Sequence, residues 1–234
     1  MTLSHDEQRE KWDKEHAEPY ALKQMDARKG SSSLAPFFEF LRKENLSNLS
    51  GLEMGCGKGR NVIWCARQPE VARMTGFDFS SVAIKEAKKR AGEAGVAGKT
   101  EFVVADATKK WPFPDASFDF GIDCTASTDI EDPERRRFAI SEMQRVLKPG
   151  GYFLLYVMST EDEYHEMVIK QSPAEEKNAF YHPDTGKFEK VFDEQELDVL
   201  YKNFRLVESR RIPKRSIFFG KEYQNKMHWR IYQK

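Results

Sequence analysis

The amino-acid sequence predicts an α/β fold, in which a mostly parallel sheet is covered by helices on both faces. Between residues 31 and 160, short apolar runs of strand length alternate with segments of helical periodicity, a pattern typical of parallel sheets. The glycine-rich turn of residues 55–59 separates the first apolar run from the helix that follows it. Such a turn is typical of α/β proteins that bind a ligand at the carboxyl ends of their strands.

The length of the chain, 234 residues, is that of one large domain. No repeat or low-complexity linker divides the sequence, so we expect a single domain over residues 1–234. Its patterning changes along the chain and defines four zones. These are an N-terminal helical cover (1–30), a core that holds the ligand (31–160), a lid (161–192), and a C-terminal helix and hairpin (193–234).

Composition argues against several classes of protein. Basic and acidic residues both number 38, whereas a dedicated nucleic-acid binder usually has a basic excess. No run of 18 apolar residues is present to span a membrane, and the charged residues 1–29 do not form a secretion signal. Three cysteines without a CxxC pair fit neither a disulfide framework nor a metal site. We therefore expect a cytoplasmic protein that holds no metal.

The elements of the core follow from periodicity and capping residues. Apolar residues recur at i, i+3, i+4 and i+7 from Leu34 to Leu41, which predicts an amphipathic helix. Ser80 and Ser81 are suitable caps for a helix that runs to Ala91. The first strand is expected to end at Met54, the next three to span 73–77, 101–104 and 118–122, and a further helix to lie near 61–63.

A fifth helix–strand pair completes the alternation. Asp132 and Pro133 fit an N-cap and the first helical position. The helix is expected to carry apolar side chains inward as far as Leu147 and to stop at Pro149, before a fifth strand over 152–157.

The last zone contains a helix and a hairpin. Asp193 and Glu196 form a capping box, and Phe192 and Leu197 flank it as a hydrophobic staple. The strand-like runs 205–212 and 228–232 are predicted to form a hairpin that closes the edge of the sheet.

Three acids are predicted to end adjacent strands. Glu53 lies in the first strand, Asp78 follows the second at a separation of 25 residues, and Asp106 follows the third. An acid in the position of Asp78 can accept from both hydroxyls of a ribose. Because the carboxyl ends of parallel strands share one edge, the sequence predicts a ligand site there.

These features together resemble the class I S-adenosylmethionine-dependent methyltransferases. The resemblance covers residues 49–158, and its glycine pattern is most similar to the small-molecule branch that includes tellurite and thiol methyltransferases. The matching positions are Glu53, Gly55, Gly57 and Gly59 in the first motif, Asp78 within residues 76–80, Asp106, and the segment Arg145–Tyr152.

The resemblance implies a doubly wound, seven-stranded Rossmann-like sheet whose last strand is antiparallel within the closing hairpin. It implies S-adenosylmethionine as cofactor, S-adenosylhomocysteine as product, and in-line displacement of the methyl group by a small-molecule acceptor. Glu53 would lie near the amino group of the cofactor, Asp78 at the ribose and Asp106 at the adenine. The implied cofactor contacts are Glu53, Gly55, Cys56, Gly57, Asn61, Asp78, Phe79, Ser80, Asp106, Ala107 and Asp123.

The acceptor side of the predicted site is defined less closely. Asp123, just after the fourth strand, would face the sulfonium and serve as a catalytic base for an oxygen or nitrogen nucleophile, although it could instead cap the following turn. The region 160–190 lacks strong periodicity and is too long for an idle connection, so we expect it to be a lid that closes with the N-terminal zone. Tyr20, His165 and His182 are the candidate substrate contacts.

Other interpretations remain open from the sequence. A nicotinamide enzyme would normally show Gly-x-Gly-x-x-Gly, and here the third glycine, Gly59, comes one residue early. The Asn/Asp-Pro-Pro-aromatic signature of amino-directed nucleic-acid methyltransferases is absent from residues 123–128. A protein or RNA methyltransferase with an open cleft, or a cofactor-binding protein without activity, stays possible, as does a monomer or a homodimer. The basic run 135–137 is interpreted as a solvated helix face.

Overall fold

The computed structural model describes residues 4–18, 29–218 and 221–234. Its main sheet has seven strands in the order β3-β2-β1-β4-β5-β9-β8, and a separate hairpin holds β6 and β7. The first five strands run parallel, whereas β9 is antiparallel to both β5 and β8. The predicted sheet and its antiparallel last strand are therefore confirmed. The strands are β1 (Leu49–Met54), β2 (Val71–Asp78), β3 (Thr100–Val104), β4 (Phe118–Cys124), β5 (Leu147–Met158), β6 (Ala179–Tyr181), β7 (Phe188–Lys190), β8 (Arg205–Phe218) and β9 (Lys221–Gln233).

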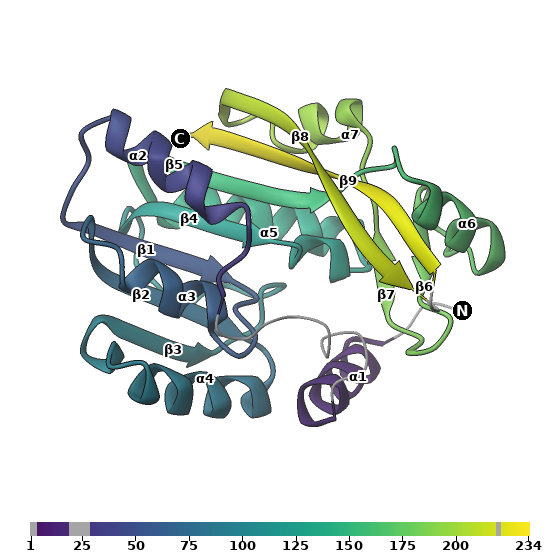
Figure 1. The fold of residues 1–234 in the computed structure, drawn as a ribbon, viewed down its shortest axis with the longest axis horizontal. Coiled ribbons are helices and arrows are strands. Elements are labelled where there is room, and N and C mark those ends of the chain that lie inside the picture. Colours follow the sequence, from purple (N-terminus) through teal and green to yellow (C-terminus); the bar gives the residue numbers. More distant parts are fainter. Residues whose placement is uncertain (1–3, 19–28, 219–220) are drawn as a thin grey trace.

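Helices cover both faces of this sheet (Figure 1). One apolar core joins α2, α3 and α4 to the sheet, and a second core on the other face joins α5 and α7 to it. The predicted apolar stripe of α2 is fully buried, and Phe37 and Phe38 pack edge-on against Phe120 at the centre of β4. The helices are α1 (His5–Ala17), α2 (Leu34–Lys43), α3 (Arg60–Ala66), α4 (Ser81–Glu93), α5 (Pro133–Val146), α6 (Glu163–Gln171) and α7 (Glu194–Leu200), with short 3₁₀ turns η2 (Ala97–Lys99) and η3 (Ser127–Asp129).

The end of α5 differs from the prediction. The helix ends at Val146, and Leu147 already has an extended backbone, with φ −71° and ψ 140°. Leu147 pairs with Phe118 of β4, so strand pairing takes over before Pro149 is reached. The ladder is irregular between Phe118 and Phe120, where the β5 strand carries its proline and two glycines. The expected strand over 152–157 is the regular part of this longer β5.

The zone expected to be an aperiodic lid is folded. It contains α6 and the β6–β7 hairpin, which share a small apolar core with the far end of β9. The side chains of Tyr164 and Val168, one helical turn apart, face that core. A nine-residue helix and two three-residue strands provide too few periods to be recognised from the sequence. The β8–β9 hairpin also extends beyond the predicted strands, and the part of β9 nearest its turn packs against α6 (Figure 1).

Candidate functional site

The carboxyl ends of β1, β2, β3 and β4 open onto a cavity of about 940 Å³. This volume is at the upper end of the range for small-molecule sites, which leaves room for two ligands side by side. Helix α1 lies beyond these strand ends and lines the opposite wall (Figure 1). The predicted cofactor contacts that line the cavity are Glu53, Gly55, Cys56, Gly57, Asn61, Asp78, Phe79, Asp106 and Ala107.

The glycine turn between β1 and α3 presents its backbone to this cavity. Gly55 and Gly57 have φ angles of +62° and +51°, which L side chains rarely adopt. A Cβ at Gly55 would lie 2.4 Å from the Cβ of Ala126, so the turn and the loop after β4 touch at this point. The Cys56 amide donates to the Phe77 carbonyl at 3.0 Å, and burial raises the pKa of its thiol. Cys56 is therefore a packed thiol rather than a thiolate nucleophile.

Glu53 is a buried carboxylate with an unmet hydrogen bond. Only 2% of the residue is exposed, and its Oε1 accepts from Asn61 Nδ2 at 2.7 Å. Asn61 is itself fixed, because its Oδ1 accepts from the Ser31 amide at 2.8 Å. Glu53 Oε2 has no partner among the described residues, and burial raises the pKa of the carboxyl to about 8. A buried oxygen without a donor is costly, so this position fits a ligand that brings a donor.

Asp78 connects the first two turns of the site. Its Oδ2 accepts from the Gly57 amide and its Oδ1 from the Ser80 amide, both at 2.9 Å. Burial raises the pKa of this carboxyl to about 6. Each oxygen retains a lone-pair direction, so the carboxylate can also accept from a ligand. Ser80 itself does not line the cavity: it is fully buried and caps α4 by accepting from the Ala83 amide.

Asp106 uses its carboxylate mainly within its own turn. Its Oδ1 accepts from the Thr108 amide at 2.8 Å and from the Thr108 hydroxyl at 2.7 Å, and Lys109 pairs with the same side chain at 3.3 Å. This side chain therefore shapes the loop after β3, where Ala107 and the neighbouring Phe79 also border the cavity.

Asp123 uses one of its carboxylate oxygens within its own turn. It is almost fully buried, and its Oδ1 accepts from the Ala126 amide at 2.9 Å and from the Ser127 amide at 3.2 Å. It is not among the residues that line the cavity. In this structure Oδ1 of Asp123 caps the turn after β4, whereas its buried Oδ2 has no partner among the described residues. Its role as a cofactor contact and base stays a prediction.

Helix α1 forms the roof of the cavity. Ser4, Gln8, Trp12 and His16 recur every four residues and all line it, so one face of the helix covers the site. The sequence predicted an N-terminal cover but did not indicate that the polar residues Ser4 and Gln8 would line the cavity. The His16 ring is buried, and burial lowers its pKa to about 4, so it is neutral at physiological pH. Tyr20, a predicted substrate contact, lies outside the described residues.

The expected histidine contacts of the lid are elsewhere. His165 is buried against the carboxylate of Asp162, and the ring of His182 accepts from the Asp184 amide at 3.3 Å. Neither residue lines the cavity, so their assignment to the substrate wall was wrong. Both side chains are instead used inside the compact unit of α6, β6 and β7. That unit contacts the roof beside β7, where Lys187 Nζ lies 3.7 Å from the centre of the Trp12 ring.

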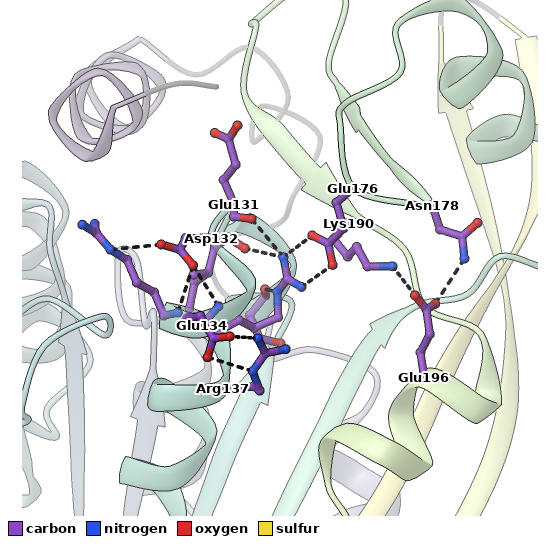
Figure 2. Close-up of polar contacts among 12 residues, drawn as sticks. Glu131, Asp132, Glu134, Arg137, Glu176, Asn178, Lys190 and Glu196 are labelled. Atoms are coloured by element: carbon purple, nitrogen blue, oxygen red, sulfur yellow. Dashed lines mark hydrogen bonds and ion pairs between the residues drawn. The ribbon is translucent and has the colours of Figure 1, made fainter. Parts of the chain in front are cut away.

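Arg136 is a second residue whose role the sequence did not indicate. Only 1% of it is exposed, so the solvated face predicted for residues 135–137 is wrong at this position, whereas Arg135 and Arg137 are exposed as predicted. Its guanidinium donates at 2.8 Å to both carboxylate oxygens of Glu176, which is labelled in Figure 2. It also donates to the backbone carbonyls of Ser127 and Ile130. Arg136 therefore holds the loop after η3, which lines the cavity. Its spacing of four from the buried Ile140 was the available signal.

Comparison with known proteins agrees with this geometry. Residues 52–151 match a family described as a methyltransferase domain. A solved S-adenosylmethionine-dependent methyltransferase from Methanosarcina mazei superposes with a TM-score of 0.72 at 28% identity, over 83% of this chain and 96% of that one. These similarities support a class I S-adenosylmethionine-dependent methyltransferase. The narrower resemblance to tellurite and thiol methyltransferases stays a prediction.

The names of methyltransferases that are similar to this chain refer to different methyl acceptors. The chain is 39% identical over 103 residues to a fatty-acid O-methyltransferase of Mycolicibacterium smegmatis. It is 40% identical over 102 residues to a phthiotriol/phenolphthiotriol dimycocerosates methyltransferase of Mycobacterium tuberculosis. Each match covers 44% of this chain and only 35% of the relative. A 1,6-didemethyltoxoflavin-N1-methyltransferase of Burkholderia thailandensis, solved with S-adenosylhomocysteine, shares only the fold with this chain. The two superpose with a TM-score of 0.68 at 18% identity, over 100% of this chain and 92% of that one.

No described helix is both long enough and apolar enough to cross a membrane. Within the same residues, histidine, cysteine and acidic side chains nowhere gather in a group of three that could hold a metal ion.

Proposed function

We propose that this protein transfers a methyl group from S-adenosylmethionine to a small-molecule or lipid acceptor. The observation that carries the proposal is the pair of buried acids at adjacent strand ends, Glu53 and Asp78, which open with the glycine turn onto one cavity. This arrangement offers hydrogen-bond acceptors to both an amino group and a ribose. The named relatives support transfer to lipids and small molecules.

The residues present fit the cofactor. Glu53 Oε2, which lacks a described partner, suits the ammonium of the methionine moiety. The guanidinium of Arg60 also lines the cavity and interacts electrostatically with Glu53, so it suits the carboxylate of the same moiety. The Asp78 carboxylate suits the ribose hydroxyls. Phe79, Asp106 and Ala107 would border the adenine.

The chain contributes binding and orientation rather than a reactive group. When bound, S-adenosylmethionine supplies an electrophilic methyl group on a positively charged sulfur, which a nucleophile displaces in line. The α1 roof, held to α4 by a hydrogen bond from Ser80 to Asp13, excludes water from the space where the reactants meet. Arg136 fixes the facing wall after η3, and such positioning can account for a large part of the rate enhancement.

A protein or RNA acceptor is the second candidate, and the roof argues against it. A macromolecular acceptor needs an open cleft, whereas Gln8 and Trp12 extend over the cavity from the opposite side to the sheet. The neutral net charge also provides no general attraction for a nucleic acid.

The direct test supplies the protein with S-adenosylmethionine labelled in its methyl group, together with a lipid and metabolite extract. At a cofactor concentration below saturation, we expect labelled small molecules to form with wild type and at least several-fold less of them with Asp78→Ala. The Asp115→Ala variant, at an exposed acid remote from the cavity, should behave as wild type. Labelling of protein or RNA alone would favour the second candidate. Tight S-adenosylhomocysteine binding without any labelled product would favour a cofactor-binding protein without transferase activity.

A further inference from the structure

The end of the cavity between α1 and η3 contains acidic and acceptor groups that the cofactor does not need. We propose that this acceptor end, defined by Gln8, Trp12, Asp129 and Ile130, binds an acceptor molecule that carries a protonated amine on an apolar body. The inference rests on the proposed function, because it assigns the class of molecule that shares the cavity with the cofactor.

Asp129 provides the charge. It is the last residue of η3 and lines the cavity, and its carboxylate makes no hydrogen bond or ion pair within the described part of the chain. Glu189 on β7 lies close enough to oppose its ionisation, while Lys187 favours it, and burial together with Glu189 raises the pKa of Asp129. A cationic ligand would relieve the repulsion between these two carboxylates.

Gln8 provides an independent indication of a hydrogen-bond donor. The residue is only 6% exposed and lines the cavity from α1. Its Nε2 donates to Glu131 Oε2 at 3.4 Å, while its Oε1 is buried without a partner among the described residues. An amide oxygen only accepts hydrogen bonds, so the missing partner must be a donor. An ammonium group supplies three hydrogen-bond donors and a positive charge to pair with the carboxylate of Asp129.

The cations near this end are already engaged. Lys187 lies over the Trp12 ring and 3.8 Å from Glu15, and Arg135 pairs with Asp132 at 3.6 Å. Arg60 belongs to the opposite end of the cavity, beside Glu53.

Glu131 is engaged as well, since it accepts from the hydroxyl of Tyr181 in addition to Gln8. The remaining unpaired charge at the acceptor end is therefore negative within the described residues. A carboxylate acceptor, of the kind named for the mycolicibacterial relative, would be repelled there.

The apolar body follows from the other residues of the acceptor end. Trp12 and Ile130 face the same space and offer apolar surface beside the polar atoms of Gln8 and Asp129. Because Lys187 already lies over the Trp12 ring, this ring contributes apolar surface for the body of the acceptor rather than a site for its ammonium. A charged amine without apolar surface would leave this half of the wall unused.

The test measures binding, not turnover, with three probes of similar shape. Protein saturated with S-adenosylhomocysteine is titrated calorimetrically with 2-phenylethylamine, 2-phenylethanol and 3-phenylpropionate. We expect the amine to bind at least tenfold more tightly than the alcohol and the carboxylate. Equal affinities, tighter binding of the carboxylate, or no measurable binding of the amine would overturn the inference.

Two variants assign the preference to Asp129. Asp129→Asn should abolish the tenfold preference for the amine while leaving the affinity for S-adenosylhomocysteine unchanged. Glu134→Gln removes the same charge from the exposed face of α5 and should preserve the preference. An unchanged preference in Asp129→Asn would overturn the inference. S-adenosylhomocysteine is titrated first, so failure of the proposed function can be told apart from failure of this inference. The former would appear as a lack of cofactor binding in the wild-type protein.

Discussion

The close approach of the glycine turn to the loop after β4 can be tested by adding a single methyl group. In Gly55→Ala the new Cβ would lie 2.4 Å from the Cβ of Ala126, and the residue would keep a φ of +62°. Gly95→Ala is the matched control, because Gly95 has a φ of +72° but a Cβ added there would meet no atom of the described residues within 4 Å. The two variants therefore share the backbone cost and differ in the contact.

The magnitudes follow from these two terms. A left-handed backbone costs an L residue roughly 1–2 kcal/mol, so both variants should lose about that much stability. In a chain of this size each kcal/mol corresponds to about 2–4 °C in melting temperature. Carbon atoms pack favourably at about 3.5–4.0 Å, so in Gly55→Ala the turn and the loop must also separate by about 1 Å. That displacement moves the backbone that faces the cofactor.

Thermal unfolding and calorimetric titration with S-adenosylhomocysteine distinguish the two terms. We expect both variants to melt several degrees lower, and only Gly55→Ala to lose cofactor affinity, by tenfold or more. If Gly55→Ala binds S-adenosylhomocysteine as tightly as Gly95→Ala does, the turn is not the backbone wall of the cofactor site and the reasoning is refuted.

Three further perturbations test other parts of the site. Asp78→Ala should weaken S-adenosylhomocysteine binding at least tenfold, since charge-assisted hydrogen bonds contribute about 1.5–3 kcal/mol. It should also lower the melting temperature, because two backbone amides lose their acceptor. Unchanged affinity by calorimetry would contradict this role. Because burial raises the pKa of Glu53 to about 8, a bound ammonium should lower it, so binding at pH 7 should release about one proton and tighten as the pH rises towards 8. Titrations in buffers of different ionisation enthalpy measure this release, which Glu53→Gln should abolish. Arg136→Ala should lower the free energy of unfolding in urea by at least about 2 kcal/mol, because it leaves Glu176 and two carbonyls without their donor. Arg137→Ala, which breaks an exposed ion pair, should change this free energy little. Equal losses in the two variants would show that the burial of Arg136 is unimportant.

The parts of the fold that depend on local signals could be predicted from the sequence. The α2 stripe, the Asp132 cap and the box formed by Asp193 and Glu196 are patterns within a few residues, and each is present in the structure. The helix-to-strand boundary at Leu147 was misplaced, because it depends on pairing with Phe118, which is distant in sequence. The unit of α6, β6 and β7 was missed because its elements are too short to show a period.

The same distinction applies to the site. Gly55, Glu53 and Asp78 were found because strand ends of a parallel sheet converge regardless of side-chain detail. The sequence left both roles of Asp123 open, because a position at a strand end does not determine whether the carboxylate faces the cavity or its own turn. The contribution of Gln8 depends on where α1 docks, a tertiary contact that a polar residue on a charged helix does not indicate.

Equilibrium binding of the cofactor tests the central claim most directly. Calorimetric titration of the wild-type protein with S-adenosylhomocysteine and, separately, with NAD compares the ligand that the site fits with the main alternative for a glycine-rich turn. We predict one site with about micromolar affinity for S-adenosylhomocysteine and at least hundredfold weaker binding of NAD. Tight binding of NAD with no response to S-adenosylhomocysteine would contradict this claim.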